Sequence, residues 1–132
     1  MKNEKRKLFI LVDFDQTCII NNYPEVGPDI KGAVEVLMEL SKKGHKLILW
    51  TCRGTDHKGL SMAKSWFRER GIPLYAIQDN PEQWTDSRKV FGDILIDDTA
   101  LGTPLIYNPA ISESGFVDWK GIREILVERG IL

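Results

Sequence analysis

The chain has 132 residues, of which 42% are hydrophobic and 28% are charged, the composition of an ordinary globular protein. Its formal net charge of −1 argues against a basic nucleic-acid-binding surface, so we expect no specific nucleic-acid partner. The longest uninterrupted apolar run, Leu8–Val12, is far shorter than the roughly 18 residues of a membrane helix, so we expect no membrane partner either.

Short apolar runs, which we interpret as buried strands, alternate along the chain with segments in which apolar residues recur at helical spacing. The first strand is Leu8–Val12, followed by the turn-rich segment Asn21–Pro28 and by a helix that Asp29 caps and Gly44 ends. Next come the strand Lys46–Thr51, a helix around Leu60–Phe67 that ends at Gly71, and the strand Leu74–Gln78. An irregular connection over residues 79–92 leads to the strand Asp93–Asp97, a short fifth strand at Pro104–Tyr107 and a C-terminal helix from Trp119.

Strands that alternate with helices in this way predict an α/β fold. We expect a single domain over residues 1–132, built as a three-layer, doubly wound parallel sheet with helices on both faces. Ligands of such sheets bind beyond the carboxyl ends of the strands, so functional side chains should gather at this edge.

Two aspartates follow the first strand directly. Asp13 and Asp15 are two residues apart in extended geometry, so both side chains leave on the same side of the chain. Two carboxylates this close repel each other unless a cation lies between them, and Mg²⁺ takes oxygen ligands readily. The alternative, a pair of solvated turn acids, fits less well with an apolar strand that leads directly to the pair.

Polar residues also follow two later strands. The second strand ends in Thr51, and Arg53 and a glycine come next, a combination that can hold a phosphate. Taken singly, Thr51 is explained as well by β propensity, and Arg53 by an exposed position. The fourth strand ends in Asp97–Asp98, and Lys89 precedes it. A lone lysine is usually a solvated charge, but one that reaches this edge would neutralise both a carboxylate and a phosphate.

The order of these residues resembles the four motifs of the haloacid dehalogenase (HAD) superfamily: Asp-x-Asp-x-Thr, a threonine at a strand end, a lysine, and then Asp-Asp. The match runs from Asp13 to Asp98. Gln16 stands where the commoner form of the first motif has glycine, a departure that affects the following flap and leaves both aspartates in place. Receiver domains of two-component systems also gather Asp, Thr and Lys on a doubly wound sheet, but in a different order.

The resemblance implies a role for each matching residue. Asp13 would attack phosphorus and become an aspartyl phosphate, and Asp15 would protonate the leaving oxygen and later activate water. Thr51 and Lys89 would hold the phosphoryl group, with Arg88 as the substitute for Lys89. The resemblance also implies an Mg²⁺ cofactor that Asp13, the backbone carbonyl of Asp15 and Asp97 bind directly. Asp98, the fourth metal-site residue, would act through water or by bonding to another ligand.

The spacing leaves no room for the cap domains that many HAD enzymes carry. Asp13 and Thr51 are 38 positions apart, and so are Thr51 and Lys89; the predicted elements use up both gaps. We therefore expect an open site that takes large substrates or borrows a lid from a second subunit of a homo-oligomer. The expected local cover is Cys18–Pro28 and Asp79–Asp86, with Tyr23, Arg53 and Trp84 as the side chains that touch the leaving group. Packing against the sheet edge is an equal alternative for the two aromatic residues.

These residues favour an Mg²⁺-dependent phosphomonoester hydrolase that acts on a phosphorylated small molecule or a polymer end. Two alternatives stay open. One is a non-catalytic HAD-fold binding module, against which Asp15, Lys89 and Asp97 argue; the other is a phosphotransferase whose acceptor outcompetes water. Two cysteines, Cys18 and Cys52, are too few for a disulfide framework, so we expect reduced thiols and a cytoplasmic location.

Overall fold

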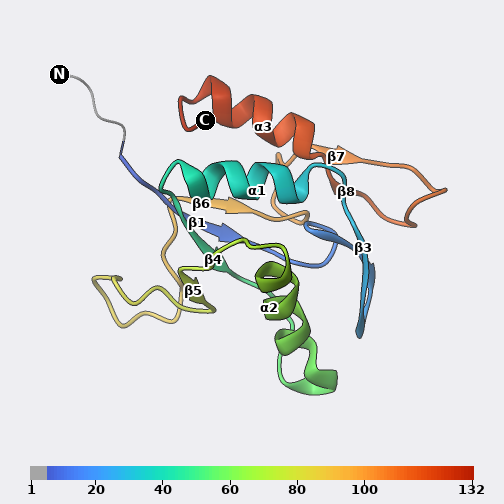
Figure 1. Ribbon diagram of the computed structural model, residues 1–132, viewed down its shortest axis with the longest axis horizontal. Helices are drawn as coiled ribbons and strands as arrows, with labels where there is room; N and C mark the ends of the chain where they lie inside the picture. The colour runs from blue at the N-terminus through green and yellow to red at the C-terminus, as the bar shows by residue number, and fades with distance from the viewer. Residues whose placement is uncertain (1–5) are drawn as a thin grey trace.

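A computed structural model describes residues 6–132, so the first five residues of the predicted domain lie outside the described part (Figure 1). A parallel sheet has the strand order β5-β4-β1-β6. Its strands are β1 Phe9–Val12, β4 Lys46–Leu49, β5 Ala76–Ile77 and β6 Ile94–Ile96. The helices are α1 Ala33–Lys42, α2 Gly59–Glu69 and α3 Trp119–Glu128, with a 3₁₀ turn, η1, at Asp56–Lys58. The protein is therefore a mixed α/β protein, as predicted. Within residues 6–132, no helix has the length and apolar character needed to cross a membrane.

Two antiparallel hairpins lie beyond the carboxyl edge of the sheet (Figure 1). One joins β2 Ile19–Asn22 to β3 Glu25–Asp29, and the other joins β7 Leu105–Ile106 to β8 Phe116–Val117. The segment predicted as turn-rich is thus mostly strand, and the predicted fifth strand pairs with β8 instead of joining the main sheet. Asp29, the predicted helix cap, accepts hydrogen bonds from Trp66 Nε1 and from Arg70. Helix α1 begins later, after Gly32, whose φ of 91° requires glycine.

The register of the central strands brings three strand ends to the same level. Val12 of β1 lies beside Leu49 of β4 on one side and beside Ile96 of β6 on the other. Because all these strands are parallel, the residues that follow them leave the sheet at one edge. The sequence-predicted site residues Asp13 and Asp97 therefore start from adjacent positions.

The main hydrophobic core lies on one face of the sheet. Strand β1 contributes Ile10 and Val12 to it, and buried residues of α1, α2 and α3 all join the same cluster. The opposite face presents Leu11 and Ile48, which pack with Val90 of the 79–92 connection. The described residues therefore place helices on one face only, where we predicted helices on both.

The handedness of parallel connections explains this one-sided cover. The steps from β1 to β4 and from β4 to β5 run in the same direction across the sheet, so right-handed crossovers put α1 and α2 on one face. The return from β5 to β6 must cross the other face, and residues 78–93, which make it, contain no helix. Leu95 of β6 is 42% exposed on that face.

Candidate active site

The carboxyl edge of the sheet carries a hollow of about 420 Å³. The loops that follow β1, β4 and β6 line it together with the β2–β3 hairpin. The sequence-predicted residues in its wall are Asp13, Asp15, Tyr23, Thr51, Arg53, Asp97 and Asp98. The residues in its wall that the motifs did not single out for the site are Gln16, Asn21, Cys52 and Thr99. Most of the predicted site is thus gathered in one place.

Three carboxylates form a cluster in this hollow. Oxygen atoms of Asp13, Asp97 and Asp98 all lie within 4.8 Å of one another. Thr17, which is fully buried, donates a hydrogen bond from Oγ1 to Oδ2 of Asp13 at 2.8 Å. The same hydroxyl oxygen accepts a bond from the backbone N–H of Asp98 at 3.1 Å. Thr17 therefore fixes the loop after β1 to the loop after β6.

The crowding of these groups perturbs their protonation. Burial raises the pKa of Asp13 to about 8, and the interaction with Asp98 and the charge of Asp97 act in the same direction. Burial also raises the pKa of Asp98, although its hydrogen bond with Asp13 opposes the change. The cluster therefore holds negative charge poorly on its own.

A divalent cation fits this arrangement. Within residues 6–132, no basic side chain forms an ion pair with any of the three clustered aspartates. Several carboxylate oxygens close together are the ligands that Mg²⁺ and similar hard cations select. Asp13, Asp97 and Asp98 are thus a chemically suitable set of ligands.

Asp15 does not share this cluster, because its carboxylate pairs with Arg53. Nε of Arg53 donates to Oδ2 of Asp15, and Nη2 donates to Oδ1, both at 2.8 Å. The Arg53 side chain is 1% exposed and that of Asp15 is 25% exposed. The two aspartates of the first motif therefore lie in different surroundings: Asp13 among like charges, and Asp15 against a cation.

Thr51 is held by a residue that the motifs did not single out. Gln78, just after β5, donates from Nε2 to the Thr51 carbonyl at 2.6 Å and accepts from the Thr51 backbone N–H at 2.9 Å. The Thr51 hydroxyl accepts a bond from the backbone N–H of Arg53 at 3.1 Å. Gln78 has a φ of 59°, a backbone conformation that sequence patterns do not reveal for glutamine.

Gln16 connects the site to a loop far away in the sequence. Its φ is 64°, in the region that favours glycine, which is the residue at this position in the commoner HAD motif. Its Nε2 donates to both Ser112 Oγ, at 3.1 Å, and Ser114 Oγ, at 3.0 Å. Its Oε1 accepts from the backbone N–H of Asn21 at 2.7 Å. The Gln16 side chain therefore ties the segment after β1 to the β7–β8 hairpin.

Three predicted site residues lie elsewhere. Arg88, Lys89 and Trp84 are exposed on the 79–92 connection, and none of them lines the carboxylate hollow. Lys89 and Trp84 line a different hollow of about 680 Å³, on the sheet face that carries Leu95. Trp84 is 77% exposed and packs edge-on against Phe91. The structure therefore does not bring the expected third-motif cation to Asp13.

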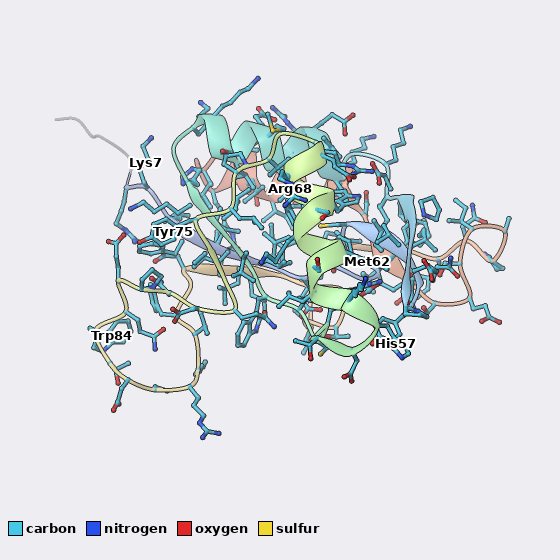
Figure 2. The ribbon with its side chains drawn as sticks, turned by 60° about the horizontal axis from the view of Figure 1, so that its bottom comes forward. Lys7, His57, Met62, Arg68, Tyr75 and Trp84 are labelled. Carbon is cyan, nitrogen blue, oxygen red and sulfur yellow. The ribbon has the colours of Figure 1, made fainter. Side chains whose placement is uncertain are left out.

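The direction of β6 explains this placement. Lys89 precedes β6, whereas Asp97 follows it, so the two residues lie at opposite ends of the strand unless the connection doubles back over the carboxyl edge. Residues 79–92 instead run across the uncovered face of the sheet. Figure 2 shows Trp84 on a loop at the left, well away from His57, whose ring packs against that of Tyr23, a residue that lines the candidate site. Cover from Asp79–Asp86 is therefore not observed, and only the β2–β3 part of the predicted cover reaches the hollow.

The fold and the site together describe a mixed α/β protein with a carboxylate-rich hollow at the carboxyl edge of its sheet. No protein-family model matches the chain, and neither does any curated protein. A solved structure of a conserved protein from Bacteroides thetaiotaomicron is 34% identical to this chain, with a TM-score of 0.76. The match covers 94% of this chain and 93% of that one. The chain therefore belongs to the same family as this conserved Bacteroides protein.

Proposed function

We propose that this protein is an Mg²⁺-dependent phosphomonoester hydrolase with a capless, Rossmann-like core of the HAD type. The observation that carries the proposal is the cluster of Asp13, Asp97 and Asp98, whose oxygens lie within 4.8 Å of one another. The parallel order β5-β4-β1-β6 supports it, because it places the residues of the first, second and fourth motifs at three neighbouring strand ends. The substrate would be a phosphorylated small molecule or the end of a polymer, since the hollow is open.

Asp13, Asp97 and Asp98 would hold the cation. A bound Mg²⁺ supplies positive charge against the phosphoryl oxygens and lets Asp13 approach phosphorus as a carboxylate. Thr17 keeps the Asp13 carboxylate oriented through the 2.8 Å bond from its hydroxyl. Thr51 lines the same hollow and offers its hydroxyl to a phosphoryl oxygen.

The proposed reaction then has two steps, in which Asp13 and Asp15 take part. An oxygen of Asp13 forms a bond to phosphorus while the bond from phosphorus to the leaving oxygen breaks, and Asp15, which first takes up a proton from solvent, passes that proton to the leaving oxygen. In the second step Asp15 takes a proton from water as the water oxygen attacks the phosphorus of the aspartyl phosphate. Phosphate leaves, and both aspartates return to their starting states.

A second candidate is a divalent-cation-binding module without catalysis. The position of Lys89 favours it, because this residue lines the hollow on the uncovered sheet face and leaves the carboxylate site without the third-motif cation. A phosphate dianion would then meet a site whose fixed charges are mostly negative. The two candidates differ in turnover, whereas both predict cation binding.

The test is a panel of phosphomonoesters with Mg²⁺, with excess chelator, and with Ca²⁺ in place of Mg²⁺. We expect Mg²⁺-dependent phosphate release, weak support by Ca²⁺ because of its looser geometry, and loss of activity by orders of magnitude in Asp13→Asn. Adding an alcohol acceptor separates hydrolysis from phosphoryl transfer. Full activity in excess chelator contradicts the proposal, and Mg²⁺ binding by calorimetry without turnover on any ester assigns the protein to the second candidate.

A further inference from the structure

We propose that Arg53 is a positioning residue that joins the Asp15 carboxylate to the β2–β3 hairpin, so that the acid/base group and the cover of the site move together. The kinetic part of this inference rests on the proposed hydrolase function. The structural part rests on the contacts of Arg53 alone.

Arg53 bridges two parts of the chain. Besides its paired bonds to Asp15, it donates from Nη1 to the carbonyl of Pro24 at 2.9 Å. It also donates from Nη2 to the carbonyl of Glu25 at 2.8 Å. Pro24 lies at the tip of the hairpin, and Glu25, the first residue of β3, follows it directly. One buried guanidinium therefore holds the loop after β1 and the tip of the hairpin at the same time.

The two aromatic rings next to Arg53 also come from these two parts of the chain. The guanidinium carbon lies 5.1 Å from the ring centre of Phe14 and 5.1 Å from that of Tyr23. Phe14 is fully buried in the core, whereas Tyr23, on the hairpin, is 47% exposed. A planar guanidinium can pair with two carboxylate oxygens while aromatic rings flank it, and a lysine ammonium cannot.

These contacts limit what Asp15 can do. Its neighbour Gln16 is bonded through its side chain to Ser112 and Ser114 of the β7–β8 hairpin, which holds the backbone next to Asp15 in place. Both oxygens of Asp15 accept bonds from Arg53, so one of them must leave this pairing to take up a proton and pass it to a leaving group. Since Arg53 also holds the hairpin tip, the position of the hairpin sets the orientation of Asp15.

This arrangement predicts a dependence on the leaving group that a purely structural role does not. An alkyl leaving group needs a proton in the transition state, and a nitrophenyl leaving group hardly does. In Arg53→Ala, we expect kcat/KM on alkyl phosphates, which reports the steps up to release of the leaving group, to fall at least about tenfold, equivalent to about 1.4 kcal/mol. The value of kcat/KM on nitrophenyl phosphate should fall by less than about threefold, although kcat falls on both classes of ester if hydrolysis of the aspartyl phosphate limits turnover.

The experiment uses the full chain with Arg53→Ala, Arg53→Lys and the control Arg123→Ala. Arg123 makes a comparable paired contact with Glu39, with bonds of 2.9 and 2.7 Å, but on the exposed surface between α1 and α3. We expect the control to match the parent, and Arg53→Lys to lose alkyl phosphate hydrolysis because lysine cannot pair with both oxygens of Asp15. Guanidinium ions well below denaturing concentrations should restore part of the activity of Arg53→Ala. Equal losses of kcat/KM on both classes of ester, or kcat/KM within about twofold of the parent on both, overturn the positioning role.

A second measurement does not depend on activity. Hydrogen exchange of the β2–β3 amides is compared in Asp15→Asn, in Arg53→Ala and in the double variant. We expect each single variant to speed exchange in the hairpin, and the double variant to add less than the sum of the two. Additive effects overturn the coupling between Asp15 and the hairpin. If no phosphoester is hydrolysed by the parent, the proposed function fails, and this cycle alone decides the structural inference. Should Arg53→Ala not fold, Arg53→Lys takes its place in the cycle.

Discussion

Replacing Asp13 by Asn should make the metal-free protein more stable while it removes the proposed nucleophile. Asn keeps an oxygen that can accept the bond from Thr17, but it carries no charge. The Asp13 carboxyl has an ordinary pKa of 3.8 and a folded-state pKa of about 8, chiefly because of burial. The folded protein therefore holds this proton more tightly than the unfolded chain does, and ionising the cluster opposes folding.

The size and pH dependence of the effect follow from linkage. Below about pH 4 the carboxyl is protonated in both states, and Asp13→Asn should change stability little. As the pH rises from about 4 to 8, the unfolded chain loses the proton first, so the parent loses stability relative to the variant across this window. At about 1.4 kcal/mol per pH unit, the upper bound at pH 7 is about 4 kcal/mol, and we expect at least about 1 kcal/mol because water and neighbouring groups share the charge.

Urea unfolding in excess chelator at pH 4, 7 and 8.5 measures this difference. Asp15→Asn is the matched control, because the same substitution two residues away removes the partner of a buried arginine. We expect it to lower stability by about 2 kcal/mol or more, the opposite sign. Adding Mg²⁺ should raise the midpoint of the parent more than that of Asp13→Asn, by mass action. An Asp13→Asn variant that is less stable than the parent at pH 8.5 without metal would refute the electrostatic reasoning.

Three further predictions follow from single contacts. Gln16→Ala should lower stability by about 2 kcal/mol and speed proteolysis in residues 112–115. Gln16→Gly should be about 1 kcal/mol more stable than the alanine variant because φ at position 16 is positive, and equal stabilities of the two variants would contradict this. His45→Ala should lower stability by about 2 kcal/mol in urea unfolding, because the buried ring bonds both to the backbone before β1 and to the C-terminal tail; no change would contradict it. Lys89→Ala should keep kcat/KM within about twofold, whereas Thr51→Val should lose more than about tenfold; a large loss in Lys89→Ala would mean that the 79–92 connection moves to the site during catalysis.

The central strands and the residues that directly follow them were predictable because the apolar pattern that specifies each strand lies within a few consecutive residues. The apolar run Leu8–Val12 can satisfy its backbone only in a buried strand, and its register follows once neighbouring runs of similar length pair with it. The same pattern predicted that Asp13 and Asp97 would meet, since both follow parallel strands directly. The predicted site residues that the structure brings together are those within a few positions of a strand end.

The errors share one cause, which is that sequence spacing does not give the path of an irregular segment. Lys89 fits the order of the HAD motifs, but order along the chain says nothing about which end of β6 a preceding residue occupies. Trp84 was assigned to the site on the same assumption. The role of Gln78 was missed because its contacts with Thr51 depend on the pairing of β4 with β5 and on an unusual φ. Long-range contacts of this kind require the fold itself.

The contrast between the two aspartates of the first motif is the strongest physical argument that the site binds a cation. The chain supplies Asp15 with a buried arginine, but within residues 6–132 it supplies no such partner to Asp13, Asp97 or Asp98. Ionising this cluster opposes folding at neutral pH, since burial and like charges raise the pKa of Asp13. A cluster of three carboxylates that weakens the metal-free fold is explained if a divalent cation binds there, because the cation offsets the repulsion among them. The expected stabilisation of the metal-free protein by Asp13→Asn, together with its loss of response to Mg²⁺, tests that explanation directly.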